Sequence, residues 1–341
     1  MRLAVEPVRL RLRTPLRAAW GELAERELLL VTLTDSDGVS GQGEASALEP
    51  YDGVPAAALW AALDAYASVL AAMPPGAGPD ELIAACRAER DLPQALAGVD
   101  LALWDLEGRR AGVPVAELLH PRAAAAIAVN ATLGASDRAG AAAEAAAAVA
   151  RGYRALKVKV GTGDDAGRVA AVRAAAPDAT IRIDANGAWA TPQEALAHLR
   201  ALAPAGIELA EEPVRGVEAL RAVRSGTTVP VAMDETAALP GAVGAGAVDA
   251  VCLKVSRCGG ITGLLADAAA ARAAGSAVYV ASTFDGPLGI AAALHAAAAL
   301  AADGPLPACG LATLEAFVDH ELPGMLTDGA LPVPTGPGLL G

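Results

Sequence analysis

The sequence predicts an α/β protein in two parts, an N-terminal α+β unit followed by a parallel (β/α) barrel. Three observations support this prediction. The 341 residues exceed one minimal domain and suit a large barrel with a second unit. The first 120 or so residues show strand patterns followed by helical patterns. After residue 126, short β-branched runs alternate with alanine-rich helical runs, which is typical of repeated βα units.

The N-terminal unit is expected over residues 1–121. The run "ELLLVTLTD", the turn "SDG" and the run "VSGQGEAS" form a hairpin pattern. From Pro55 to Leu119 the apolar spacing becomes helical, and "DLPQALAGVDLALWDLEGRRAG" has an aspartate at its start and a glycine at its end.

The barrel is expected over residues 122–311. Seven or eight βα units follow one another, with predicted strands "AIAVNATL", "ALKVKV", "TIRIDAN", "IELAEEP", "VPVAMDE", "AVCLKV", "AVYVAS" and a shorter "ACGL". An open doubly wound sheet is the alternative, and it is disfavoured because no glycine-rich phosphate loop follows the first strand. Residues 312–341 are rich in Pro and Gly and are expected to pack back as coil against the first unit.

Composition excludes several classes of protein. A net charge of −13 and a pI of about 4.8 argue against binding to a phosphate backbone, so no nucleic-acid partner is expected. No run resembles a membrane span or a signal peptide, and a cytoplasmic protein is predicted. The four cysteines show neither CxxC spacing nor a disulfide framework. The sequence leaves a homo-oligomer open.

Polar residues interrupt the predicted strands at one repeated place, the carboxyl end. The chain has only three lysines, Lys157, Lys159 and Lys254, and all lie at such ends. The third, fourth and fifth strands end in acids or amides: Asp184 and Asn186, Glu211 and Glu212, and Asp234 and Glu235. Because parallel strands place their carboxyl ends at one mouth of a barrel, these side chains are expected to converge there.

The predicted chemistry is metal-assisted proton transfer. Asp184, Glu211 and Asp234 offer only oxygen ligands, which suits Mg²⁺, with Mn²⁺ as the other candidate. Asn186, Glu212 and Glu235 are expected to support these ligands from behind. Neighbouring cations lower the pKa of an ammonium, and arginine stays protonated, so lysine is the residue type that can give up a proton here.

The motifs "KVKVG", "RIDANGAW", "LAEEPV", "AMDET" and "LKVSRCGGI" resemble the enolase superfamily, in its muconate-lactonizing subgroup. The resemblance implies a modified (β/α)7β TIM-type barrel with an α+β capping domain that the C-terminal tail completes. It also implies that Asp184, Glu211 and Asp234 hold Mg²⁺, that Lys159 is the general base, and that Lys254 lies on the opposite face of a small carboxylate substrate. The superfamily's lysine base and Mg²⁺-stabilised enediolate are a worked example of general acid–base chemistry.

Within the family, the sequence looks most like the o-succinylbenzoate synthases of menaquinone biosynthesis, which are lyases. Dipeptide epimerase, N-acylamino acid racemase and muconate cycloisomerase are the alternatives. Dipeptide epimerases carry Asp-x-Asp near the eighth strand, where this chain reads "ACGLAT"; "SRCGG" after Lys254, however, is similar to the epimerases.

Substrate specificity is expected to come from loops over the barrel mouth. In the first unit the candidates are Arg17 and Trp20 in "TPLRAAWG" and Tyr51 and Asp52 in "LEPYDGV". In the barrel they are Asn130, Ser282 and Thr283.

Overall fold

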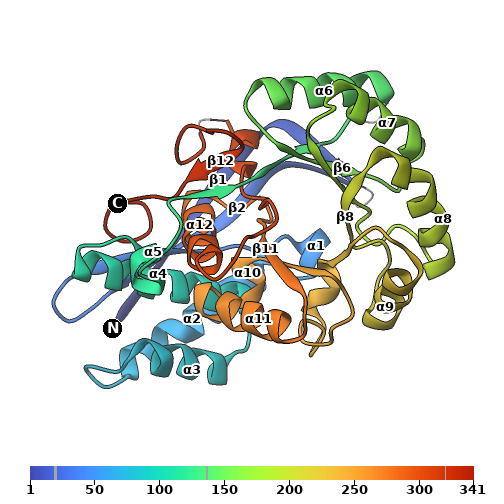
Figure 1. The fold of residues 1–341 in the computed structure, drawn as a ribbon. Helices are drawn as coiled ribbons and strands as arrows, with labels where there is room; N and C mark the ends of the chain where they lie inside the picture. The colour runs from blue at the N-terminus through green and yellow to red at the C-terminus, as the bar shows by residue number, and fades with distance from the viewer. Residues whose placement is uncertain (19–20, 136, 319) are drawn as a thin grey trace.

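The computed structural model describes residues 1–18, 21–135, 137–318 and 320–341, with the side chains of residues 16–22 outside the description. Figure 1 shows the long N-terminal ribbon of strands crossing behind a curved parallel sheet that helices surround. The predicted α/β architecture, a parallel barrel preceded by an antiparallel unit, is confirmed. Within the described part of the chain, no helix combines the length and apolarity needed to cross a membrane.

The N-terminal cap is a three-stranded antiparallel sheet with helices against it. Its strands are β1 (Arg2–Ala18), β2 (Gly21–Thr34) and β3 (Ser40–Ala45), and Thr34 pairs with Ser40 as the hairpin pattern predicts. Its helices are α1 (Glu49–Asp52), α2 (Ala56–Ala72), α3 (Pro79–Glu89), α4 (Pro93–Ala111) and α5 (Val115–Leu119). A Cβ at Gly43 would lie 2.2 Å from the Gly98 carbonyl oxygen, so glycine allows α4 to pack closely on β3.

In the part of the chain that the structure describes, the barrel sheet has seven parallel strands in chain order. They are β5 (Asn130–Leu133), β6 (Ala155–Lys159), β7 (Thr180–Asp184), β8 (Ile207–Glu211), β9 (Val231–Met233), β10 (Ala250–Leu253) and β11 (Ala277–Val280). The surrounding helices are α6 (Arg138–Ala150), α7 (Asp165–Ala175), α8 (Pro192–Leu202), α9 (Val217–Gly226), α10 (Val255–Cys258), α11 (Ile261–Ala273) and α12 (Pro287–Ala301). The described residues also form the 3-10 turns η1 (Ala203–Ala205), η2 (Glu235–Ala238) and η3 (Thr313–Ala316).

The eighth barrel position is filled by a short segment instead of a strand. Cys309 bridges Val129 and Gly310 bridges Ala281, both in parallel, so residues 309–310 lie between the first and last strands of the sheet. The predicted strand "ACGL" is therefore two isolated bridges. The predicted strand "AIAVNATL" is likewise divided, since β4 (Ala126–Ala128) leaves the barrel to pair with β12 (Ala330–Pro332).

The C-terminal tail contacts both parts of the molecule. Val318 N–H donates to the Arg11 carbonyl and Val115 N–H donates to the Gly338 carbonyl, which joins the tail to the cap. β12 joins the tail to the barrel. These contacts accord with the expectation that the tail packs back on the cap, while the boundaries at residues 121 and 311 stay a prediction.

The buried helix α12 receives its N-terminal cap from the other part of the chain. Its own capping residue is Gly286, which has no side chain to offer. The Glu44 carboxylate of β3 accepts from the N–H of Gly286 at 2.7 Å and of Gly289 at 3.4 Å. A carboxylate suits this place because the first turn of a helix has unpaired donors and a partial positive charge. Glu44 therefore ties the cap sheet to the barrel.

Glu44 predicts a pH-dependent stability. Burial, aided by Asp285 and opposed by the helix N–H groups and Arg26, raises the pKa of Glu44 from 4.5 to about 7. The folded protein thus holds this proton while the unfolded chain releases it, so stability falls as pH rises from about 4.5 to about 7. With rising pH, the free energy of unfolding of Glu44→Gln should therefore decrease by about 2–3 kcal/mol less than that of the wild type. Urea unfolding of both proteins across pH 4.5–8 measures it, and parallel curves would contradict the prediction.

Candidate active site

The three predicted metal-binding acids lie on adjacent strands in register. Lys159 of β6 pairs with Asp184 of β7, and Asp184 pairs with Glu211 of β8. Asp234 follows the last residue of β9 directly. Each acid is almost completely buried. Parallel pairing in register puts residues of one rung side by side, which brings these acids together at the carboxyl end of the sheet.

The lysines flank the acids from two sides. Lys157 and Lys159 belong to β6, and Lys254 follows β10. The strands that carry the three acids, β7, β8 and β9, lie between β6 and β10 in the sheet. Because the sheet curves into a barrel, β6 and β10 approach the acids from opposite directions. The three lysines therefore converge with the acids, as their sequence positions predict.

The two lysines of β6 have different surroundings. Lys157 Nζ lies 2.8 Å from both Asp184 Oδ2 and Glu211 Oε2, and its side chain is only 13 % exposed. Lys159 Nζ lies 2.6 Å from Asp184 Oδ2 and 2.8 Å from Asn186 Oδ1, and its side chain is 38 % exposed. Lys159 is thus the lysine of this strand that a substrate at the mouth can reach.

The ammonium groups and the carboxylates shift one another's pKa. Burial disfavours the charged form of Lys157, but Asp184 and Glu211 outweigh it and raise the pKa of Lys157. Burial likewise opposes ionisation of Asp184, yet Lys157 and Lys159 hold the pKa of Asp184 below its usual value. The expectation that neighbouring cations lower the pKa of an ammonium at this site is therefore not met at Lys157 by the protein groups alone. A divalent cation on the same carboxylates would act in the expected direction.

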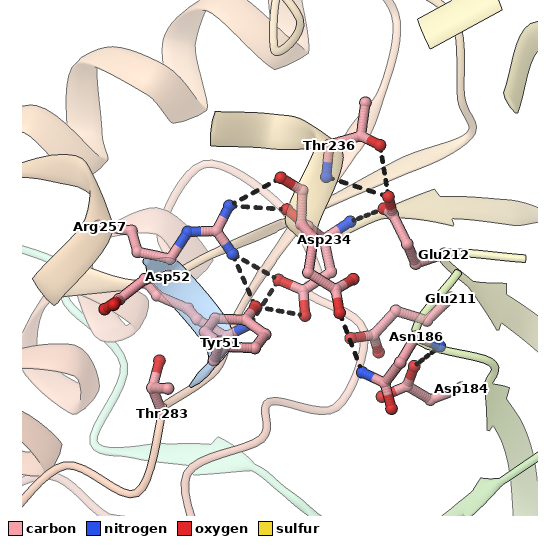
Figure 2. Close-up of polar contacts among 12 residues, drawn as sticks. Tyr51, Asp52, Asp184, Asn186, Glu211, Glu212, Asp234, Thr236, Arg257 and Thr283 are labelled. Carbon is pink, nitrogen blue, oxygen red and sulfur yellow. Dashed lines mark hydrogen bonds and ion pairs between the residues drawn. The ribbon is translucent and has the colours of Figure 1, made fainter. Parts of the chain in front are cut away.

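Lys254 contacts the cap as well as the barrel. Its Nζ donates to the Tyr51 hydroxyl at 2.6 Å and forms a short ion pair with Asp234 Oδ1. The Tyr51 hydroxyl in turn donates to Asp234 Oδ2 at 2.9 Å. Burial opposes the charge on Lys254, and Asp234 outweighs it, so the pKa of Lys254 is raised. Figure 2 shows Tyr51 and Arg257 converging on Asp234.

Arg257 is a site residue that the sequence did not single out. Its guanidinium donates to the Tyr51 hydroxyl at 2.7 Å, to Asp234 Oδ1 at 3.1 Å and to the Asp234 carbonyl at 2.9 Å. It comes from α10, three residues after Lys254, so one helical turn places both cations on the same aspartate. That spacing within "LKVSRCGG" is the signal that could have identified it.

The carboxylates fit a hard divalent cation. Glu211 Oε1 is buried without a hydrogen-bond partner among the described residues, and Oε2 has only the Lys157 ion pair. Potential ligand atoms of Glu211, Asp234 and Cys252 lie within 4.8 Å of one another. Burial raises the pKa of Cys252 well above its usual value, so its thiol stays protonated, and Mg²⁺ takes oxygen ligands. Asp184 joins these acids through the shared contact with Lys157.

Glu212 forms hydrogen bonds to the backbone around Asp234. Its carboxylate accepts from the backbone N–H of Asp234 at 2.7 Å and of Thr236 at 3.0 Å, and its side chain is fully buried (Figure 2). Glu212, one residue after β8, and Asn186, two residues after β7, both have positive φ, 39° and 48°. Non-glycine residues in this region are strained, and such strain is concentrated at functional sites.

A second series of side-chain hydrogen bonds orients Lys159. The Asn186 side chain accepts from Lys159 and donates to Glu235 Oε1 at 3.1 Å. Glu235 Oε1 also accepts from Arg215 Nη2 at 3.0 Å. Arg215, in the loop after β8, was not predicted; its position three residues after Glu212 gave no periodic signal. Asn186 thus links Lys159 to Glu235.

The predicted cap residues fall in different places. Tyr51 reaches the lysine and the aspartate at the barrel mouth. Asp52 instead accepts from the backbone N–H of Leu48 and Val54, so its carboxylate stabilises its own turn. Arg17 lies in β1, but its side chain is outside the described part of the structure. Trp20 lies outside the described residues.

The predicted barrel residues Ser282 and Thr283 follow β11 at the mouth. The Ser282 hydroxyl is 2.6 Å from the Thr313 hydroxyl, whereas Thr283 Oγ1 is buried with no partner among the described residues. Figure 2 places Thr283 below the segment that carries Tyr51 and Asp52. Asn130 pairs with Ala155, two residues before the rung of Lys157, so it lies deeper in the barrel than the mouth. A role for these three residues in binding substrate stays a prediction.

Comparison with known families gives two matches that together span most of the chain. Residues 140–340 match the model described as "Enolase C-terminal domain-like". Residues 1–120 match the "Mandelate racemase / muconate lactonizing enzyme, N-terminal domain". The two matches correspond to the barrel and to the cap.

The individual relatives have names that state different reactions. A "Hydrophobic dipeptide epimerase" of Roseobacter litoralis is 33% identical over 302 residues, 86% of each chain. An "o-succinylbenzoate synthase" of Mycobacterium ulcerans is 42% identical over 190 residues, 53% of this chain and 56% of that protein. The crystal structure of a dipeptide epimerase of Enterococcus faecalis, complexed with Mg and the dipeptide L-Leu-L-Tyr, matches with a TM-score of 0.88. That structural match covers 99% of this chain and 98% of the other at 27% identity.

Proposed function

The chain belongs to the enolase superfamily, and from this premise we propose that it is an enzyme that removes a proton α to a substrate carboxylate. Asp184, Glu211 and Asp234 would hold Mg²⁺, or Mn²⁺. When bound, the ion supplies Lewis-acid stabilisation of the negative charge that develops on the substrate carboxylate. The buried Glu211 oxygen that has no hydrogen-bond partner among the described residues supports this assignment. Burying a carboxylate oxygen without a donor costs free energy unless a cation coordinates it.

The lysines divide the proton transfers between them. Lys159 is partly exposed and oriented by Asn186, and it takes the α-proton from one face. Lys254 is buried under Tyr51 and paired with Asp234, and it stands protonated on the opposite face. Lys157 stays ionised between Asp184 and Glu211 and keeps positive charge beside the reacting carboxylate.

Among reactions that begin this way, we propose o-succinylbenzoate synthesis, a syn dehydration and therefore a lyase reaction. Lys159 removes the α-proton, then returns it to the departing hydroxyl on the same face, so that water leaves. The observation that carries this choice is the rim segment 308–313, "ACGLAT", which has no ionisable side chain apart from a buried cysteine. The free α-ammonium group of a dipeptide substrate would have no carboxylate to pair with in this segment. The 42% identity to an o-succinylbenzoate synthase agrees with this choice.

The second candidate is an epimerase or racemase acting on an α-carbon. The observation in its favour is the pair of lysines, since Lys159 and Lys254 approach the acids from opposite sides of the sheet. Such a pair can remove a proton from one face and deliver one to the other. The dipeptide epimerase relatives, which match across most of the chain, also favour it.

A direct assay separates the two candidates. With Mg²⁺ and the cyclohexadiene carboxylate substrate, we expect formation of o-succinylbenzoate at about 1–10³ per second, the usual range for enzymes. In parallel, N-acylamino acids and dipeptides are incubated in D₂O, and loss of the α-proton signal is followed by NMR. Dehydration without rapid exchange supports the synthase. Exchange without dehydration would replace it with the epimerase or racemase.

A further inference from the structure

We propose that Arg26, a buried arginine of the cap, is a positioning residue for substrate binding. It joins the cap segment that leads to Tyr51 to the barrel loop that carries Thr283, and so fixes the Thr283 hydroxyl toward the substrate. This inference rests on the proposed function, because it concerns how that same site holds its substrate.

Arg26 makes its hydrogen bonds to main-chain carbonyls on both sides of the mouth. Its Nη1 donates to the Ala47 carbonyl, just before α1. Its Nη2 donates to the Thr283 carbonyl at 3.1 Å, and its Nε approaches the Phe284 carbonyl at 3.4 Å. The residue is 3% exposed. One planar, rigid guanidinium thus holds two segments more than 230 positions apart in sequence at a fixed separation.

Acidic side chains near Arg26 add a second link between the cap and the barrel loop. Asp285 Oδ1 accepts from the Ser46 hydroxyl at 2.9 Å, which again joins the cap segment to the barrel loop. Glu44 holds the start of α12, the helix into which this loop leads. A Cβ at Gly289 would lie 2.8 Å from both Asp285 Cβ and Glu44 Oε1, so the two acids flank one helix turn. Together with Arg26 they form a polar cluster between cap and barrel.

The loop that Arg26 holds is strained and carries an unpaired hydroxyl. Phe284 has φ of 56°, a conformation that bulky residues avoid unless their surroundings impose it. Two of the Arg26 hydrogen bonds go to the carbonyls at and before this residue. Thr283 Oγ1 is buried without a partner among the described residues, and Arg26 holds the Thr283 carbonyl near Ala47, in the segment that leads to Tyr51. A buried hydroxyl left unpaired by the protein at a binding site is a hydrogen-bonding group for a ligand.

Kinetics of matched variants test the proposal. Arg26→Lys keeps the charge but loses the rigid fork, and we expect KM to rise about 10-fold while kcat stays within about 3-fold. Thr283→Val should raise KM similarly. The KM of the double variant should be no higher than that of the more impaired single variant, since both substitutions remove the same interaction. Arg9→Lys, on the exposed face of the same ribbon, is the control and should match the wild type. An unchanged KM in Arg26→Lys, or additive losses in the double variant, would overturn the proposal.

Amide hydrogen exchange distinguishes failure of this inference from failure of the proposed function. If the wild type turns over none of the three substrate classes, the proposed function fails, and exchange alone decides the role of Arg26. We expect Arg26→Lys to speed exchange at residues 47–52 and 283–286 and to leave strands β6 to β8 unchanged. Equal exchange in both proteins at those two segments would refute the positioning role.

Discussion

Replacing Lys159 with alanine is expected to lower kcat by about 10³–10⁴-fold, the range that a positioned general base contributes. Lys159 is the only described group that both contacts Asp184 and Asn186 and has a side chain open enough to meet a substrate at the mouth. The fold should survive, because this side chain is partly exposed and the ion pair of Lys157 with Asp184 remains. Steady-state kinetics and circular dichroism measure the two outcomes.

Lys159→Arg is the informative control for that variant. Arginine keeps the positive charge near Asp184 but cannot release its proton at any ordinary pH, so it should be as inactive as alanine. If the arginine variant kept activity within 10-fold of the wild type, Lys159 would act only through its charge, and the assignment as base would be wrong. Near-normal turnover in Lys159→Ala would have the same consequence.

Replacing Glu211 with glutamine is expected to weaken Mg²⁺ binding by at least about 100-fold and to abolish turnover. Glu211 is the acid on the middle one of the three strands, and one of its oxygens has no donor among the described residues. A neutral amide offers the cation one weaker oxygen and no charge. Titration calorimetry measures the binding, and a chelator followed by added Mg²⁺ should restore the wild type but not the variant.

A stability measurement checks the same site without substrate. Saturating Mg²⁺ at about 100 times its Kd should add about 2.7 kcal/mol to the stability of the wild type by mass action. Glu211→Gln should lose this gain. Glu218→Gln, an exposed acid on α9, is the matched control and should keep it. An equal Mg²⁺-induced stabilisation of the wild type and Glu211→Gln would show that the ion binds elsewhere.

The sequence predicted that the acids and lysines converge at one rim, because one rule governs their placement. Lys157, Lys159, Asp184, Glu211, Asp234 and Lys254 all interrupt apolar strands at one end, and parallel strands place those ends together. Closure of the barrel was predicted less well. The "ACGL" segment makes two isolated bridges instead of a strand, one to Val129 just before β5 and one to Ala281 just after β11.

The residues that surround this rim could not be predicted in the same way. Tyr51 was singled out from its loop, but its hydrogen bonds to Asp234 and Lys254 join residues about 200 positions apart. Asp52, its neighbour in sequence, caps its own turn instead. Arg215 and Arg257 resemble other surface arginines in sequence, and only their partners distinguish them.

The sequence by itself determined the order of strands and helices, the convergence of acids and lysines at one rim, and the kind of chemistry that such a rim supports. These follow from local periodicity and from the single direction of the strands. Only the tertiary structure decided which cap residues meet that rim, how Arg26 and Glu44 hold the cap on the barrel, and which lysine stays accessible. Those features depend on docking two separately patterned parts of the chain, and neither pattern carries information about the other's surface.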